Sequence, residues 1–230
     1  MSAYSKRKGL DVHIMRNKII AILVCLFVCS AVYAQAVEEE VKKSRTPDVI
    51  YVPTPQDVVD KMLELAKVKK DDLVYDLGCG DGRIVVTAAK RRGCKAVGYD
   101  IDPQRVKESL ENVEKNKVGH LVRIEEKDIF TLDLSKANVI TLYLLPELNV
   151  RLIPQLEKLK PSSRIVSHDF DMKGVKPDKV VKVTSNNDDF EAEHEIYLWT
   201  TPLKKRKEKA PHKVCAPTQA HAGCAGSDGE

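Results

Sequence analysis

The sequence has 230 residues, of which 43% are hydrophobic and 31% are charged. A chain of this length forms one or two domains, and its hydrophobic content is sufficient for a buried core. The formal net charge is +4, but residues 1–34 hold five basic residues and one acid, so the remainder has 33 basic (38 minus 5) and 33 acidic (34 minus 1) side chains. This balance argues against the global basic field of a nucleic-acid-binding protein.

The N-terminal region contains an uninterrupted apolar run, residues 19–29 (IIAILVCLFVC), behind a basic flank. With Val32-Tyr33-Ala34 after it, this is the layout of a secretory signal peptide that is cleaved after Ala34. As a helix, residues 19–37 would also just cross a thin bilayer. We therefore predict a signal peptide or a membrane anchor over 1–34. In both cases the domain lies outside the cytoplasm, exported (periplasmic or secreted) or membrane-anchored.

Two polar segments flank a predicted domain at residues 48–202. Residues 35–47 read as a linker. Residues 203–230 combine the basic run LKKRKEK with small residues and proline, and we predict a disordered tail. Cys215 and Cys224 would form a disulfide bond in an oxidising compartment or remain idle thiols. With His212 and His221 they also offer an adventitious metal site.

Within the domain, the pattern alternates between helix and strand. Thr54 is expected to be the N-cap of the first helix, with Pro55 at its first position and Asp57 completing a capping box. Further helices are predicted at 83–91, 103–117 and 147–159, where Pro154 should kink or split the last one. Strands are predicted at 73–77, 95–99, 122–125, 138–144, 164–168, 179–184 and 195–200.

This order predicts an α/β fold with a doubly wound, mostly parallel, seven-stranded sheet of the Rossmann-like kind. No helical pattern separates the last two strands, and Asn186, Asn187, Asp188 and Asp189 lie between them. We therefore expect a C-terminal antiparallel hairpin to close the sheet.

The strongest chemical signal is the segment VYDLGCGDG at residues 74–82, where a buried strand ends in a glycine turn that opens a helix. Glycines allow the backbone to approach a ligand closely. The next strand ends in Asp100, and an acid there is able to hold both ribose hydroxyls of an adenosine ligand. Arg83 stands where a dinucleotide fingerprint requires Gly or Ala. Asp76 is suited to an ammonium group and unsuited to a pyrophosphate.

These residues resemble motif I and the ribose-binding acid of class I S-adenosylmethionine (SAM)-dependent methyltransferases. Lys127-Asp128-Ile129 is similar to their next motif, in which an acid meets the adenine amino group. The resemblance implies SAM as cofactor. The SAM-binding residues that it implies are Tyr51, Thr54, Asp76, Gly78, Cys79, Gly80, Asp100, Ile101, Asp128 and Ile129.

A finer resemblance rests on residues 51–55 (YVPTP), 81–85 (DGRIV) and 141–146 (TLYLLP). They are similar to the mitochondrial lysine methyltransferases that act on the c subunit of ATP synthase and on the adenine nucleotide translocase. Residues 166–172 (VSHDFDM) resemble a segment of the bacterial relatives. This resemblance implies a protein lysine as substrate and association with a membrane through the N-terminal apolar segment. From the charge balance we expect no nucleic-acid partner, and the oligomeric state stays open.

Tyr143, His168 and Asp169 are the candidate catalytic residues, expected to line the methyl-transfer channel or to orient or deprotonate the acceptor amine. Purely structural roles in strand packing and loop capping stay open for all three. Many class I enzymes that methylate amines or amides carry the motif Asn/Asp-Pro-Pro-Tyr/Phe at this strand end, and the polar first residue of that motif is missing before Tyr143. We predict no metal site at residues 193–195, because neighbouring side chains of a strand face opposite sides. A small-molecule or lipid methyltransferase, or a non-catalytic SAM-binding scaffold, is the alternative.

Overall fold

The computed structural model describes residues 51–185 and 191–206, which form one seven-stranded sheet in the order β3-β2-β1-β4-β5-β7-β6. Strands β1 to β5 run parallel, and β7 runs antiparallel between β5 and β6. The predicted fold class is confirmed. The strands are β1 (Leu73–Leu77), β2 (Lys95–Asp100), β3 (Val122–Glu126), β4 (Val139–Leu142), β5 (Arg164–His168), β6 (Lys179–Ser185) and β7 (Ala192–Thr200).

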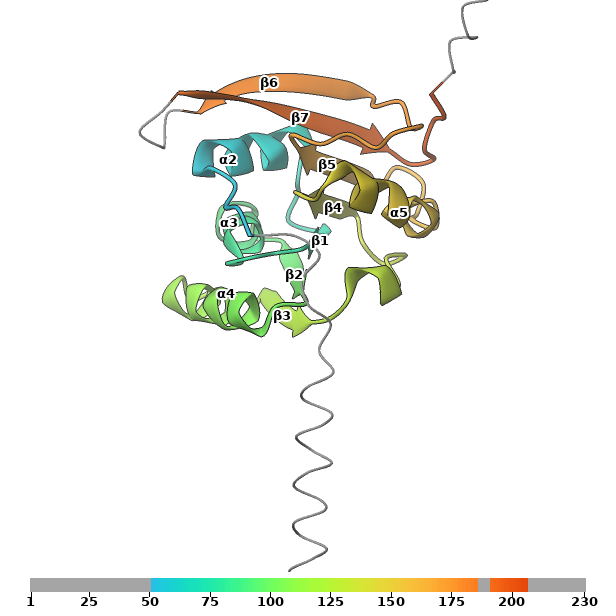
Figure 1. The fold of residues 1–230 in the computed structure, drawn as a ribbon. Helices are drawn as coiled ribbons and strands as arrows, with labels where there is room; N and C mark the ends of the chain where they lie inside the picture. Colours follow the sequence, from blue (N-terminus) through green and yellow to red (C-terminus); the bar gives the residue numbers. More distant parts are fainter. Residues whose placement is uncertain (1–50, 186–190, 207–230) are drawn as a thin grey trace, which may run out of the picture.

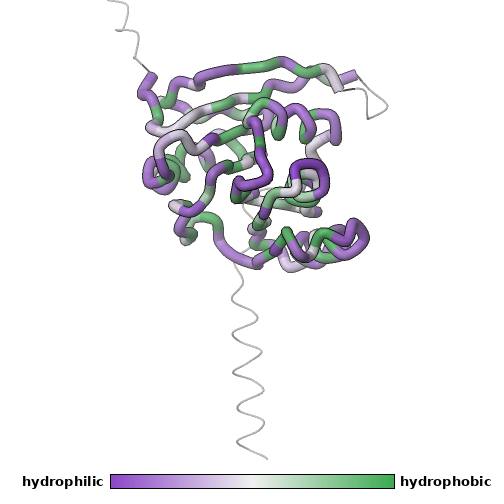
Figure 2. Tube along the Cα trace, turned by 180° about the vertical axis from the view of Figure 1, so that it is seen from behind, coloured by the Kyte–Doolittle hydropathy of each residue, from purple (hydrophilic) through white to green (hydrophobic). Residues whose placement is uncertain are grey.

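Helices cover both faces of the sheet, as Figure 1 shows: α2, α3 and α4 on one side, α5 and the short helix η1 on the other. Each side has its own hydrophobic core. Figure 2 shows hydrophobic residues concentrated in the central segments, whereas the β6–β7 hairpin carries both kinds along its length. The helices are α2 (Gln56–Leu65), α3 (Arg83–Arg92), α4 (Pro103–Lys115), η1 (Ile129–Thr131) and α5 (Pro146–Leu156).

The parallel strands could be predicted from the sequence because they are buried between two layers of helices. Strand β4 is buried along its whole length, and β1 and β5 are buried except at their first residue. Strands covered on both faces read as continuous hydrophobic runs. Parallel strands also bring their carboxyl ends to one edge of the sheet, where ligands bind in such folds. Asp76 and Asp100 both lie at this edge, on neighbouring strands whose register pairs Asp76 with Gly98.

The predicted start of the first helix was wrong. Pro55 is the N-cap residue of α2, and no side chain caps this helix end. The hydroxyl of Thr54 lies instead 3.2 Å from Nδ1 of His168. Oδ1 of Asp57 accepts hydrogen bonds from the backbone N–H of Val58 and from the Ser185 hydroxyl. The side chain of Thr54, which the local sequence assigns to the helix cap, therefore forms a tertiary contact with His168 instead.

The sequence predicted that Pro154 would kink or split its helix, and the helix is not split. Helix α5 continues through Pro154 and ends two residues later, at Leu156. Leu152 and Leu156 are fully buried against the sheet. Proline near a helix end removes one backbone hydrogen bond, and burial of these two leucines offsets that loss.

The first four residues of the predicted tail belong to the fold. Lys205 forms a β-bridge with Val175, Lys204 pairs with Asp178, and the Arg206 guanidinium lies 2.9 Å from a carboxylate oxygen of Asp171. The domain therefore extends past residue 202, because Lys204 and Arg206 of the basic run form ion pairs with acidic residues of the fold. None of the helices in the described residues combines the length and apolar character needed to cross a membrane. The predictions for residues 1–34, 35–47, 186–189 and 207–230 lie outside the described residues.

Candidate functional site

The turn after β1 forms the floor of the candidate site. Gly78, Gly80 and Gly82 all have positive φ, between 55° and 80°, a conformation that favours glycine. The backbone N–H groups of Gly78 and Cys79 donate to the carbonyl of Tyr99 on β2. At Gly80 an added Cβ would lie 2.1 Å from the ring of Tyr51, so the turn requires glycine for space as well as for conformation.

Asp76 lies at the end of β1, and its carboxylate is buried. One oxygen accepts a 2.6 Å hydrogen bond from the Thr141 hydroxyl. The other, Oδ2, has no hydrogen-bond partner among the described residues. Burial raises the pKa of Asp76 to about 7, against the lowering effect of the Thr141 hydrogen bond. A buried acceptor without a partner at the rim of a cavity fits a cationic ligand group such as the ammonium of SAM.

Asp100, at the end of β2, is held by backbone groups. Its Oδ2 accepts from the N–H of Gly80 at 2.8 Å, and its Oδ1 accepts from the N–H of Asp102 at 3.0 Å. Burial raises the pKa of Asp100, and these hydrogen bonds counteract that effect. The carboxylate has further lone pairs for two ligand hydroxyls. Its fixed orientation fits the ribose of an adenosine group.

A cavity of about 550 Å³ gathers the predicted cofactor residues. Its size suits one ligand of small-molecule size. Gly80 lies in the adjoining turn, and the other nine predicted SAM-binding residues line the cavity together with Tyr143. Asp128 also accepts a hydrogen bond from the N–H of Phe130, which fixes the start of η1. The site therefore fits SAM through an unpartnered buried carboxylate, a fixed second carboxylate and a glycine floor.

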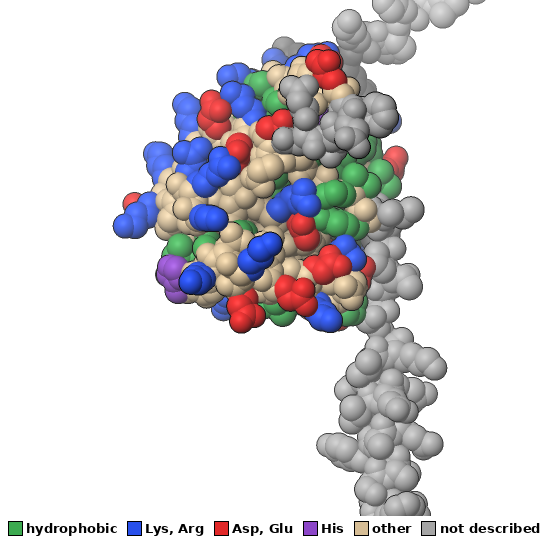
Figure 3. Space-filling view, turned by 90° about the vertical axis from the view of Figure 1, so that its left-hand side faces the viewer, with side chains coloured by type: hydrophobic (Ala, Val, Ile, Leu, Met, Phe, Trp, Pro, Cys, Tyr) green, Lys and Arg blue, Asp and Glu red, His purple; other side chains and the backbone are tan. Residues whose placement is uncertain are grey.

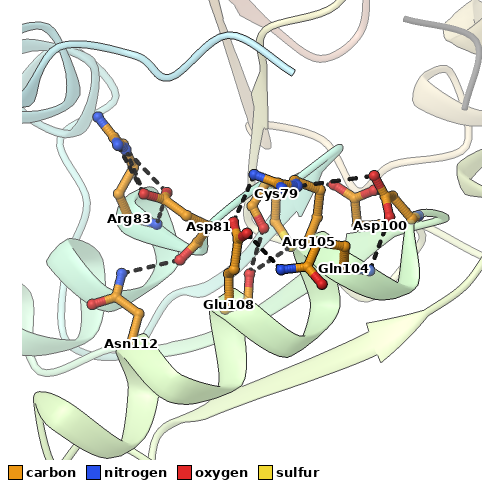
Figure 4. A network of polar contacts seen from close by, with 11 residues as sticks. Cys79, Asp81, Arg83, Asp100, Gln104, Arg105, Glu108 and Asn112 are labelled. Carbon is orange, nitrogen blue, oxygen red and sulfur yellow. Dashed lines mark hydrogen bonds and ion pairs between the residues drawn. The ribbon is translucent and has the colours of Figure 1, made fainter. Parts of the chain in front are cut away.

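Several lining residues were not predicted from the sequence. Figure 4 shows Arg83 at the start of α3 paired with Asp81, with Arg105 on α4 nearby. The Arg83–Asp81 distance is 2.8 Å, and Arg83 Nη1 also donates to the Thr54 carbonyl. The Arg105 guanidinium lies 4.8 Å from the ring centre of Tyr51. The sequence signal that could have identified Asp81 and Arg83 as lining residues was their position directly beside the glycine turn. The other unpredicted lining residues are Val52, Ile84, Asp102, Lys127, Phe130, Leu144 and Leu148.

The candidate catalytic residues come together on the side of β4 and β5, but Tyr143 alone among the three lines the cavity. The rings of Tyr143 and His168 have centroids 3.9 Å apart. Tyr143 lines the cavity, whereas His168 is fully buried behind Thr54. Burial lowers the pKa of His168 to about 4, because charging the ring would cost desolvation, although nearby Asp169 opposes this shift. The imidazole of His168 is therefore neutral at physiological pH.

Asp169 and His194 complete this end of the site. The two side chains are linked by a 3.0 Å contact between His194 Nδ1 and Asp169 Oδ2. His194 comes from β7, which pairs with β5 antiparallel and brings it next to His168. The sequence prediction considered His194 only with its neighbours Glu193 and Glu195. The structure instead groups it with residues 26 and 25 positions earlier.

Comparison with known proteins gives consistent findings. The family model described as the ANTKMT methyltransferase domain matches residues 76–179. A protein of Saccharolobus islandicus named protein-lysine N-methyltransferase is 49% identical over 158 residues, covering 68% of this chain and 96% of that protein. A lysine N-methyltransferase of Xenopus laevis, named for the C subunit of ATP synthase, is 30% identical over 155 residues, covering 65% of this chain and 66% of that protein.

Among solved structures, an RNA methyltransferase from Salinibacter ruber in complex with S-adenosyl-L-homocysteine is 45% identical. The match covers 68% of this chain and 98% of that chain, with a TM-score of 0.61. Its bound molecule is SAM without the transferred methyl group. The names of these relatives thus agree on methyl transfer and differ on the acceptor.

Proposed function

This chain belongs to the class I SAM-dependent methyltransferases, and we propose that it transfers the methyl group of SAM to the side-chain amine of a lysine in a protein. The observation that carries this proposal is the 49% identity to the protein-lysine N-methyltransferase of Saccharolobus islandicus, nearly all of which the chain covers. The Salinibacter ruber structure, named an RNA methyltransferase, makes RNA the main competing acceptor. The apolar wall of the cavity beside Tyr143 favours the amine.

SAM supplies a methyl group on a positively charged sulfur. In this chain, Asp76 would hold the ammonium and Asp100 the ribose hydroxyls of the donor. Asp128 would accept from the adenine amino group, and the glycine turn would allow close approach of the backbone. Methyl transfer to an amine disperses positive charge, so most of the rate enhancement comes from positioning, worth up to roughly 7–11 kcal/mol.

The acceptor amine would enter beside Tyr143, where Leu144 and Leu148 make the cavity wall apolar. A free lysine side chain has a pKa near 10.4, so its deprotonation near pH 7.4 costs about 4 kcal/mol. An apolar surrounding lowers that cost, because it destabilises the charged ammonium. We assign to Asp169, reached past the ring of Tyr143, the role of orienting the amine or accepting its proton. Burial, followed by the nearby charge of Asp169, raises the pKa of Tyr143. The Tyr143 hydroxyl therefore remains protonated and able to donate.

The surface around the cavity gives no support to a phosphate backbone as acceptor. The cavity charge itself does not choose between acceptors: apart from Asp76, Asp100 and Asp128, which the donor would occupy, its lining carries Asp81 and Asp102 against Arg83, Arg105 and Lys127. The face covered by α2, α3 and α4 mixes both signs, with acidic side chains among the Lys and Arg, as Figure 3 shows. Nucleic-acid binding is marked by a basic patch or stripe, and on this face the basic side chains are interspersed with acidic ones.

The acceptor experiment uses the purified full chain with radiolabelled SAM, given protein extracts, total RNA, lipids and small metabolites in separate reactions. We expect label in protein, recovered as methyl-lysine after acid hydrolysis. With SAM kept below the wild-type Kd, Asp100→Ala should lower labelling by about 10- to 100-fold. Asp133→Asn, which changes an exposed carboxylate outside the cavity lining, serves as the matched control. Label confined to RNA, lipid or a small metabolite would disprove the lysine assignment. SAM binding without any labelling would favour a non-catalytic scaffold.

We also propose that residues 1–34 carry the domain out of the cytoplasm, as a cleaved signal or as an anchor. The apolar run behind a basic flank supports this proposal. A reporter enzyme that is active only after export, fused after residue 45, tests it. A reporter that is active only in the cytoplasm would reverse the assignment and place the domain with the cellular supply of SAM.

A further inference from the structure

Three side chains beside the acceptor end of the cavity converge on one point, and we call them the His–Asp–His cluster: His168, Asp169 and His194. The three atoms concerned are His168 Nε2, Asp169 Oδ2 and His194 Nδ1. They are separated by 2.9 Å between the two nitrogens, 3.2 Å from His168 to Asp169, and 3.0 Å from His194 to Asp169. Each atom therefore touches both of the others.

Protons alone do not satisfy this triangle. Each imidazole nitrogen carries one hydrogen or one lone pair, and an ionised carboxylate oxygen only accepts. If both nitrogens carry hydrogens, two N–H groups face each other at 2.9 Å. If only one does, the other nitrogen directs its lone pair at the oxygen of Asp169. As long as the Asp169 carboxylate is ionised, every assignment leaves at least one repulsive contact, whereas a cation between the three atoms makes all three contacts favourable.

The cluster also has the outer contacts that orient metal ligands. A metal-binding histidine usually donates its second ring N–H to a neighbouring oxygen, which fixes the ligating tautomer. Nδ1 of His168 lies 3.2 Å from the Thr54 hydroxyl, which leaves Nε2 as the ligand atom. The second oxygen of Asp169 accepts from the backbone N–H of Glu195 at 2.9 Å. Asp169 has a positive φ of 57°, an uncommon conformation for a residue with a side chain.

We propose that the His–Asp–His cluster binds one divalent transition-metal ion, with Zn²⁺ as the reference ion. Ligand atoms at about 2.1 Å from one ion lie about 3.0 Å apart at right angles, on one face of an octahedron, and about 3.4 Å apart at the tetrahedral angle. The observed spacing therefore fits a six-coordinate ion. Two imidazoles and one carboxylate favour such ions over Mg²⁺, which prefers oxygen ligands. His194 and Asp169 are partly exposed, at 15% and 27% of their side-chain surfaces, so solvent completes the coordination.

The proposed ion would join the end of β5 to β7 and fix the position of Thr54 at the cavity wall. These strands are already paired, so the ion adds local rigidity at the acceptor end and is not needed for folding. The ion would also occupy the lone pairs of His168 Nε2 and Asp169 Oδ2, so Asp169 would accept the proton of the amine only in the metal-free chain. The inference stands on the cluster alone and does not depend on whether the acceptor is lysine.

The test uses the full chain, freed of metal with a chelator and titrated with Zn²⁺ by calorimetry. Co²⁺ serves as a visible-absorption probe and Mg²⁺ as the comparison ion. We expect one strong Zn²⁺ site, Co²⁺ absorption bands, and no comparable Mg²⁺ binding. His194→Ala should weaken Zn²⁺ binding at least tenfold, because one of three ligands is lost. The same variant should bind SAM as tightly as the wild type, which shows that it is folded.

The tail residues supply the matched control, since they also carry metal-binding side chains. A full-length variant with His212→Ala, Cys215→Ser, His221→Ala and Cys224→Ser should keep the strong site. Binding that disappears in this tail variant and persists in His194→Ala would overturn the proposal, as would a wild-type chain that binds neither Zn²⁺ nor Co²⁺. Asp169→Asn gives a second, independent reduction in affinity, because it replaces the charged ligand with an amide while keeping its shape.

Discussion

Replacing the buried Asp76 with asparagine should stabilise the protein and at the same time weaken SAM binding. Asp76 is 2% exposed, and Oδ2 of its carboxylate has no partner among the described residues. Burial raises its pKa from 3.8 to about 7, so above pH 7 the free enzyme carries a costly buried charge. Asp76→Asn removes that charge and keeps an oxygen for the Thr141 hydroxyl.

The magnitude follows from the two pKa values. A pKa of about 7 in the fold against 3.8 in the unfolded chain corresponds to about 4 kcal/mol of destabilisation once the group is ionised in both states. The new amide N–H₂ lacks a partner, which costs about 1–3 kcal/mol. The free energy of unfolding at pH 8 should therefore rise by about 1–3 kcal/mol. Each kcal/mol raises Tm by about 2–4 °C for a domain of this size.

The sign of the pH dependence gives a second check. Between about pH 4 and pH 7 the folded wild type retains a proton that the unfolded chain has lost, so its stability falls as pH rises through that window. The difference in stability between Asp76→Asn and the wild type should therefore grow from pH 4 to pH 7 and then level off. Thermal unfolding of both proteins without ligand, followed by circular dichroism from pH 4.5 to pH 8, measures this difference.

The SAM affinity of Asp76→Asn should fall by about 10- to 100-fold, since a charged hydrogen bond contributes about 1.5–3 kcal/mol. Calorimetry at pH 8 checks this value. For the wild type, SAM binding should strengthen as pH rises to about 7, because the ammonium pairs with the ionised carboxylate. An Asp76→Asn variant that is less stable than the wild type at pH 8, or that binds SAM equally well, would refute this account of Asp76.

Three further outcomes are expected. Asp100→Ala should weaken SAM binding by about 10- to 100-fold through lost charged hydrogen bonds, and equal affinity by calorimetry would remove Asp100 from the donor site. Asp169→Asn should lower turnover while SAM affinity stays nearly unchanged, with Asp133→Asn as control; unchanged turnover would leave Asp169 a structural residue. Gly80→Ala should lose about 1–2 kcal/mol of stability from its positive φ and displace the Tyr51 ring, and a Tm equal to the wild type would contradict that steric argument.

Local sequence is sufficient to predict the donor side of the site. The strand at 73–77, the glycine turn and the following helix are neighbours in the chain, so their residue types specify them together. Asp76 and Asp100 both end buried parallel strands, and such strands bring their carboxyl ends to one edge. The cavity therefore contains nine of the ten predicted cofactor residues, with the tenth in the adjoining turn.

The acceptor side was decided by tertiary structure. Thr54 has the residue type of an N-cap, yet its hydroxyl contacts His168, 114 positions later in the chain. The sequence offered only Glu193 and Glu195 as partners for His194, whereas the antiparallel pairing of β5 with β7 placed its Nδ1 2.9 Å from Nε2 of His168. Periodicity and local propensity act over a few residues, whereas these contacts depend on which strands become neighbours and in which register. The sequence therefore determined which residues line the cavity at the ends of β1 and β2, and the pairing of distant strands determined which side chains gather beside Tyr143.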